Sequence, residues 1–108
     1  MLDYDSIGIA LERRGNMPLA LAGWDDYSVW GWDDGCLYAQ LWQNTDNCRE
    51  APRVWIAPGS RWPSTASPCV LAEYVSMGTG CTIREAVDAM ASSAPEIVKE
   101  ALAATMGA

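Results

Sequence analysis

The sequence has no histidine, no phenylalanine and a single lysine among its 108 residues. Without histidine the commonest general base is missing, and neither a Ser-His nor a Cys-His nucleophile arrangement is available. Glycine-rich phosphate-binding motifs are also missing, because Gly78-Thr79-Gly80 is too short for one and lies between two expected helices. We therefore expect no catalytic residues, no bound cofactor and no enzymatic activity.

Metal-binding patterns are equally scarce. The four cysteines, at positions 36, 48, 69 and 81, are separated by eleven, twenty and eleven residues, so no pair has the short spacing of a zinc site. The adjacent carboxylates Asp25-Asp26 and Asp33-Asp34 lack the spaced oxygen ligands of a calcium loop. We expect plain thiols and no metal site, with a metal or redox role for the cysteines as the alternative.

Long apolar runs and a secretory leader are missing as well. No stretch approaches the ~20 apolar residues that span a bilayer, and Met1-Leu2-Asp3 is followed by neither a basic region nor an apolar core. Alanine and arginine are favoured over lysine, which hints at a GC-rich genome. We expect a cytoplasmic protein of a bacterial host that makes no membrane contact.

Acidic residues outnumber basic residues in the chain. Fourteen acidic residues against seven basic ones give a formal net charge of −7. Such a chain is repelled by nucleic acid and by anionic lipid, so we expect basic protein surfaces as partners and no direct contact with nucleic acid. The simpler interpretation is that the acidic surface only keeps the domain in solution.

The segment from Tyr27 to Gln43 organises the predicted fold. Two runs rich in aromatic and branched residues flank Asp34-Gly35, a dipeptide that favours a two-residue hairpin turn. Because side chains alternate across a strand, this register pairs Trp32 with Leu37 and separates a core face from an outer face. The core face carries Ser28, Trp30, Trp32, Leu37, Ala39 and Leu41, and the outer face carries Tyr27, Val29, Tyr38, Gln40 and Trp42.

Helix start and stop signals surround this hairpin. Ser67-Pro68 and the capping box from Thr82 to Glu85 mark two helix starts, and Gly78 is expected to end the first of these helices. We predict a single domain over residues 1–108 with an α+β fold, a two-layer sandwich of helices on one face of an antiparallel meander. The meander has three to four strands at about 18–22, 27–32, 37–43 and 53–57, with an N-terminal helix over about 6–14, capped by Asp5, and two to three C-terminal helices.

Acidic and aromatic side chains along the hairpin form the predicted site. The two carboxylate pairs lie at opposite ends of the hairpin, about 20–25 Å apart at ~3.3 Å per residue, with aromatic rings between them. Aromatic anchors rimmed by charge are typical of protein-binding patches, and a solvated acidic rim that protects strand edges is an equal alternative. A loop tryptophan beside Arg61 adds an anchor, unless its ring folds back over the sheet. The predicted partner-binding residues are Asp25, Asp26, Tyr27, Asp33, Asp34, Tyr38, Trp42 and Trp62.

Small size, acidic charge and missing catalytic groups favour an inhibitor that docks on a basic, nucleic-acid-binding surface of a partner and blocks it. In these respects the chain resembles small phage-encoded inhibitors of bacterial defence, anti-CRISPR proteins among them, and toxin-immunity proteins. Its order of elements is also that of double-stranded-RNA-binding domains, but the basic helix start that such domains need is missing. The alternative is a dimeric structural or chaperone-like module that uses an aromatic sheet face.

Overall fold

The computed structural model describes residues 4–33, 35–43, 51–58, 60, 62 and 65–105. Within them, a four-stranded antiparallel sheet combines with an N-terminal helix and three C-terminal helices, which confirms the predicted α+β class. In chain order the elements are α1 (Tyr4–Arg14), β1 (Met17–Pro18), β2 (Val29–Asp33), β3 (Cys36–Leu41), β4 (Val54–Ile56), α2 (Pro68–Thr79), α3 (Ile83–Ala91) and α4 (Glu96–Thr105). Asp34 and Cys48, which were predicted to lie in a turn and a loop, are outside the described residues.

The sheet is a meander whose strands are ordered β1-β2-β3-β4. β2 and β3 form the predicted hairpin, because Asp33 pairs with Cys36 and Trp32 pairs with Leu37. Gly35 has a φ of +80°, a left-handed conformation that glycine adopts without a steric penalty. The predicted two-residue register is therefore confirmed, and it decides which side chains share a face of the sheet.

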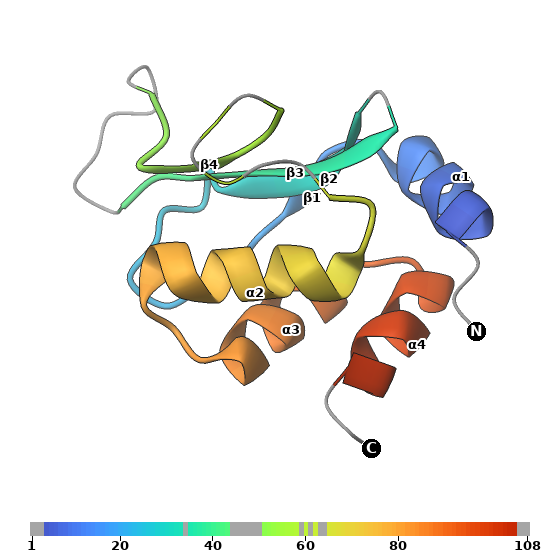
Figure 1. Cartoon of the computed structure of the whole chain (residues 1–108). Coiled ribbons are helices and arrows are strands. Elements are labelled where there is room, and N and C mark those ends of the chain that lie inside the picture. The colour runs from blue at the N-terminus through green and yellow to red at the C-terminus, as the bar shows by residue number, and fades with distance from the viewer. Residues whose placement is uncertain are drawn as a thin grey trace.

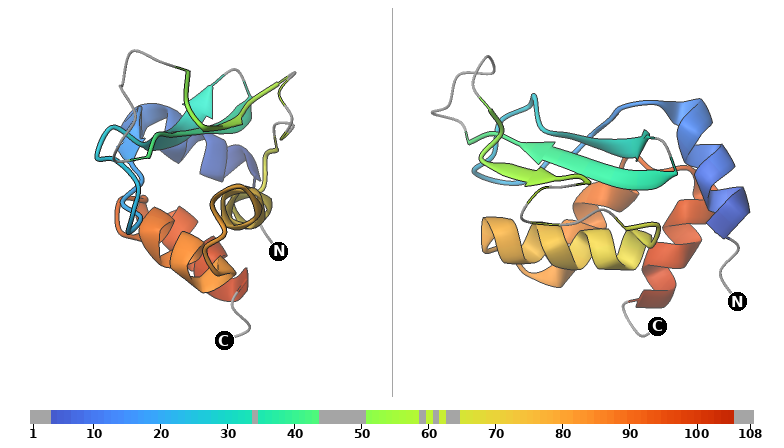
Figure 2. Two further views of the ribbon diagram at one scale, coloured as in Figure 1. Left: turned by 90° about the vertical axis from the view of Figure 1, so that its left-hand side faces the viewer. Right: turned by 45° about the horizontal axis from the view of Figure 1, so that its top comes forward.

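The helices gather on one face of the sheet. α2 packs directly on β3 and β4, and α3 and α4 pack against α2, as Figure 1 shows from the side. α1 lies at one end of the sheet, where it contacts β2 and α4. Two further views show that none of the described helices lies over the opposite face of the sheet (Figure 2). Among the described residues, helical cover is therefore confined to one face of the sheet.

The hydrophobic core fills the space between the sheet and the helices. β3 buries Leu37, Ala39 and Leu41, and β4 buries Val54 and Ile56, because alternate side chains of a strand point to the same side. The helices contribute Ile7, Leu11, Leu71, Ala72, Val75, Ala86, Val87, Ala89, Met90, Val98, Ala101 and Leu102 to the same cluster. No helix among the described residues is long and apolar enough to cross a membrane.

A buried tryptophan links the two layers. Trp30 is fully buried, and its Nε1 donates a hydrogen bond to Ser93 Oγ at 3.0 Å. Ser93 Oγ lies 2.9 Å from Pro18 O, to which it donates. Ser93 belongs to the connection between α3 and α4, so these two hydrogen bonds join the helical layer to β1 and β2.

Helix caps follow the predicted signals. Ser67 caps α2 by accepting a hydrogen bond from Val70 N, and Pro68 occupies the first turn. Thr82 Oγ1 accepts from Glu85 N at 3.1 Å while the Glu85 carboxylate accepts from Thr82 N at 3.0 Å, which is the predicted capping box of α3. The backbone N–H of Thr82 and then its side chain, both bonded to the Glu85 carboxylate, lower the pKa of Glu85 below its ordinary value, because both favour the ionised carboxylate.

The predicted end of α2 was wrong by two residues. The helix continues through Gly78 to Thr79, and Gly80 is its left-handed C-cap with a φ of +80°. Gly78 lies inside the helix at a point where β4 approaches closely, because an added Cβ would stand 2.8 Å from Val54 Cγ1. The glycine at this position therefore permits close packing of helix on sheet and does not end the helix.

Two boundaries at the N-terminal end also need correction. The strand expected over residues 18–22 is limited to Met17–Pro18, because the chain turns away from β2 with a hydrogen bond from Trp24 N to Leu21 O at 3.1 Å. α1 begins at Tyr4, so Asp5 lies in its first turn and does not cap it as predicted. Its carboxylate still lies near the positive end of the helix dipole.

Candidate functional site

The outer face of the sheet is defined by the side chains that alternate with the core. Val29, Gln40 and Trp55 form one row across β2, β3 and β4, since Val29 pairs with Gln40 and Gln40 pairs with Trp55. Gly31 pairs with Tyr38 in the next row, and Asp33 pairs with Cys36 at the hairpin end. By this register, three strands place aromatic, amide and carboxylate side chains on one face. The described helices do not cover that face (Figure 2).

Tyr38 lies flat across its neighbouring strand because its partner has no side chain. A Cβ placed on Gly31 would stand 2.8 Å from Tyr38 Oη and 3.1 Å from the carbonyl oxygen of Gly15. Gly31 is therefore the position where the tyrosine ring and the α1–β1 connection approach the strand backbone. A glycine inside a strand commonly marks such a close approach.

The electrostatic environment of Tyr38 is set by burial and by Asp33. Partial burial, and then the negative charge of Asp33, raise the pKa of Tyr38 above its ordinary value. Both effects disfavour the phenolate, because it would place a second negative charge beside the first. Tyr38 therefore presents a neutral hydroxyl on the outer face at physiological pH.

A cavity of about 560 Å³ opens on this face. Tyr38, Gln40 and Trp55 line it from the sheet, and Gly15 and Asn16 line it from the α1–β1 connection. Further lining residues are Val29, Trp32, Asp33, Cys36, Leu37, Ala57 and Pro58. Trp55 is 47% exposed, which is unusual for so large an apolar side chain in a strand. The cavity has the size of a ligand pocket or of a site for one side chain of a partner.

The predicted acidic pair at the other end of the hairpin is organised differently. Asp25 Oδ1 accepts a hydrogen bond from Tyr27 N at 3.0 Å, so this carboxylate supports a turn. Asp26 and Tyr27 are exposed, and the Tyr27 side chain is 57% exposed. Trp42 is half-buried, and its backbone bonds to the buried Ser28 hydroxyl. Of this group, Asp26 and Tyr27 offer the most accessible side chains.

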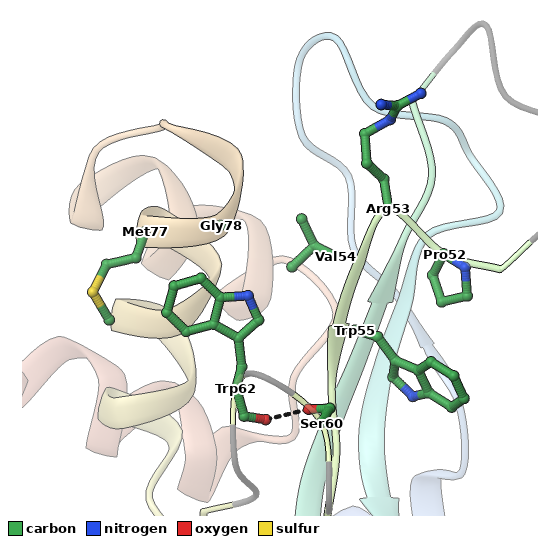
Figure 3. A pocket seen from close by; sticks show the side chains of 8 residues that line it. All are labelled: Pro52, Arg53, Val54, Trp55, Ser60, Trp62, Met77 and Gly78. Carbon is green, nitrogen blue, oxygen red and sulfur yellow. Dashed lines mark hydrogen bonds between the residues drawn. The ribbon is translucent and has the colours of Figure 1, made fainter.

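Trp62 lies apart from the hairpin residues. Its ring packs against Tyr74 of α2 with centroids 5.9 Å apart and a 38° tilt between the planes. It forms one wall of a second cavity, about 420 Å³, between α2 and β4. Figure 3 shows Trp62 and Met77 on the helix side of this cavity and the Trp55 ring on the other side of β4. Its role as a partner anchor stays a prediction, separate from the outer face.

The described residues also bear on metal and thiol chemistry. Within residues 4–33, 35–43, 51–58, 60, 62 and 65–105, no three histidine, cysteine, aspartate or glutamate side chains come close enough to share a metal ion. Cys36 and Cys81 carry free thiols. Thr79 Oγ1 lies 3.1 Å from the Cys81 sulfur and donates to it, and the Cys69 thiol lies 3.7 Å from Ala101 O.

The structure divides the predicted site residues between different places. Of the predicted site residues, Asp33 and Tyr38 share the outer-face cavity, whereas Asp25, Asp26 and Tyr27 precede β2. Trp55 was not predicted as a site residue, although its alternation with Val54 and Ile56 indicated that it faces away from the core. Asn16 carried no sequence signal, because only the tertiary fold places the α1–β1 connection beside β2.

Comparisons with known proteins add no family assignment. No protein-family model, no curated protein and no solved structure matches the chain significantly. Function is therefore inferred from the fold and from the outer face.

Proposed function

We propose that the protein is a non-enzymatic interaction protein that docks its outer sheet face on a basic surface of a partner protein. The observation that supports this most strongly is the exposed Trp55 ring, which lines one cavity together with Tyr38 and Asp33 on a face that no described helix covers. Exposed aromatic rings supply most of the binding energy in many interfaces, and the polar groups around them fix orientation.

The charge of the molecule specifies the kind of partner. The formal net charge is −7. Asp33, the last residue of β2, and Asp26, which lies before that strand, are both exposed. A negative surface accelerates encounter with a positive one and disfavours nucleic acid and acidic proteins. Basic surfaces of this kind are common where proteins handle nucleic acid. We therefore propose that the bound partner is blocked at such a site, as an inhibitor would block it.

The test is affinity capture from bacterial lysate with wild-type protein and with two matched variants. Trp55→Ala removes the exposed ring of the outer face, and Met77→Ala removes an exposed side chain of similar apolarity from α2. We expect a basic protein that is retained by the wild type and by Met77→Ala, released by salt, and lost with Trp55→Ala. Equal retention by both variants contradicts docking through the outer face.

The blocking step needs a second measurement on the captured partner. The purified partner is mixed with a labelled nucleic acid, and the protein is then added in increasing amounts. Displacement of the nucleic acid by the wild type, but not by Trp55→Ala, is the expected result. If the partner binds the nucleic acid and this protein at the same time, docking is supported and inhibition is contradicted.

One alternative use of the same face is favoured by a specific observation. The exposed Trp55 ring and the neighbouring Val29 supply apolar area that a second copy of the chain would cover. A dimeric structural module would then be the function, and its association would depend little on salt. Sedimentation of the wild type and of Trp55→Ala distinguishes the two, because a dimer through this face becomes monomeric in the variant.

A further inference from the structure

The outer-face cavity brings a backbone carbonyl and a carboxylate together with a neutral tyrosine hydroxyl. Tyr38 Oη and the Gly15 carbonyl oxygen converge above Gly31, since both lie about 3 Å from the Cβ position that glycine leaves empty. Asp33 adds an exposed carboxylate at the hairpin end of the cavity, and Gln40 adds an amide oxygen. Among the described residues that line the cavity, Asp33 is the sole charged residue and no basic side chain neutralises it there.

Aromatic surface borders the same space. Trp55 is 47% exposed at one side, and Tyr38 lies across Gly31 at the other. Indole and phenol rings attract cations over their faces through the ring quadrupole, by about 0.5–1 kcal/mol at exposed sites. The cavity therefore combines the two features that recognise a flat cation, which are aromatic faces and a carboxylate at the rim.

Other occupants fit less well. An anion would be repelled by Asp33, and no basic side chain among the described lining residues would offset that repulsion. An apolar side chain would cover the carbonyl and carboxylate oxygens without bonding them, and buried polar groups without partners are costly. A lysine ammonium would satisfy the charge, but it lacks the planar surface that stacks on an aromatic ring.

We propose that this cavity is a binding pocket for an arginine side chain of the partner protein. The guanidinium group would donate to Asp33 and to the Gly15 carbonyl, and its plane would stack on the aromatic side chains. This inference rests on the proposed function, because it names the chemical group that the outer face recognises. It places the specificity of the docking surface in one pocket between Trp55 and Tyr38.

The test uses two small probes that differ in charge and little else. N-acetyl-arginine amide and the neutral N-acetyl-citrulline amide are titrated separately into isotope-labelled protein, and amide chemical shifts are followed. We expect millimolar binding of the arginine probe, at least about tenfold tighter than citrulline, with shifts at Gly31, Tyr38 and Trp55. Equal affinity for the two probes would overturn the proposal, as would an absence of saturable shifts.

Two matched variants test whether the Asp33 carboxylate binds the arginine probe. Asp33→Asn removes the carboxylate at the cavity, and Asp88→Asn removes an exposed carboxylate on α3, so both change the net charge equally. We expect Asp33→Asn to weaken arginine binding about tenfold and Asp88→Asn to leave it unchanged. Equal effects of the two variants would overturn the pocket and indicate attraction by net charge alone.

The outcome remains distinguishable from that of the capture experiment. If the arginine probe does not bind while Trp55→Ala still loses the partner, the docking face stands and the arginine pocket fails. If the probe binds and no partner is lost with Trp55→Ala, the pocket exists but the proposed function fails.

Discussion

At the scale of single residues, polar groups inside this fold are placed where they join elements. The buried Trp30 indole uses its one donor on Ser93, and Ser93 uses its hydroxyl proton on Pro18. Ser28, the one polar residue buried within the described part of the chain, bonds to the backbone of Trp42. Each of these contacts spans more than ten positions in the sequence, so each one constrains tertiary structure directly.

Ser93→Ala tests the link between the layers. The variant leaves the Trp30 Nε1–H without its partner at 3.0 Å in a buried position, and such a donor costs about 1–3 kcal/mol of unfolding free energy. Ser92→Ala is the control, because the exposed Ser92 hydroxyl donates only to Ala89 O within its own turn. Denaturant unfolding of both variants measures the difference, and equal stability would show that the indole finds another partner.

Tyr38 gives the stability of the protein a dependence on alkaline pH. Burial and the charge of Asp33 raise the pKa of Tyr38 in the folded state, so the folded chain holds this proton more tightly than the unfolded chain. The resulting stabilisation is fully present below the unfolded pKa of about 10 and is lost as pH rises through the folded pKa. As pH rises from about 10 through the folded-state pKa of Tyr38, we expect the free energy of unfolding to fall less in Tyr38→Phe than in the wild type.

Asp33→Asn tests the second cause of the same shift. Removing the carboxylate lowers the pKa of Tyr38 toward its ordinary value, while burial continues to raise it. Phenolate absorbance during alkaline titration reports this change. A titration curve that is unaffected by the substitution would mean that Asp33 and Tyr38 do not interact across the cavity.

At the scale of elements, local signals define the hairpin and the helix starts. The Asp34-Gly35 dipeptide and the alternation around it predicted the pairing of Trp32 with Leu37, because turn length and side-chain period together allow one register. The capping box at Thr82 was likewise readable, since both of its hydrogen bonds lie within one turn. Features that depend on local chemistry were therefore predictable from the sequence.

Elements shaped by distant contacts were not predictable in this way. Gly78 was predicted to end a helix. Instead, its missing side chain allows Val54, more than twenty positions away in the sequence, to pack closely against the helix. Strand β1 ends at Pro18, although Leu19 N still donates to Ser28 O at 2.9 Å, and the chain then turns between Leu21 and Trp24. The cavity needs Asn16 and Trp55 side by side with Tyr38, so it emerges only when α1, β2 and β4 are assembled.

Gly8→Ala tests the packing of α1 on the sheet. Helix propensity alone predicts a gain of up to about 1 kcal/mol. The new Cβ would stand 2.8 Å from Trp32 Cζ2, however, and overpacking of this kind costs about 1–3 kcal/mol. We expect a net loss of stability in thermal unfolding. In a Trp32→Leu background the same substitution should become neutral or stabilising, and failure of this rescue would contradict the contact.

At the scale of the whole molecule, the described helices cover one face of the sheet, and the proposed activity uses the other face. The described helices that cover the sheet lie on one side of it, where the apolar cluster is buried (Figure 1). On the other side, Trp55 is exposed and Tyr38 is half-buried. In the proposed complex, the net charge of −7 would attract positive surfaces at long range, and the outer face would act at contact. We therefore expect charge to govern the rate of association and aromatic contact to govern the lifetime of the complex.

Charge reversal separates these two contributions once a partner is in hand. Asp33→Lys and Glu100→Lys change the net charge equally, but Glu100 lies on α4, which packs on the helical side. We expect both variants to associate more slowly at low salt, whereas Asp33→Lys alone also dissociates much faster. Surface-binding kinetics at several salt concentrations measure both rates. Identical dissociation rates for the two variants would place the interface elsewhere.

The most direct test of the outer face as the docking surface is chemical-shift mapping with a short peptide of alternating arginine and glycine. The amide spectrum of labelled protein is recorded during the titration, at low and at moderate salt. Our account predicts saturable shifts concentrated at Val29, Tyr38, Gln40 and Trp55, with the amides of α3 and α4 unmoved. Shifts concentrated on α3 and α4, or spread over all acidic residues without saturation, would contradict it.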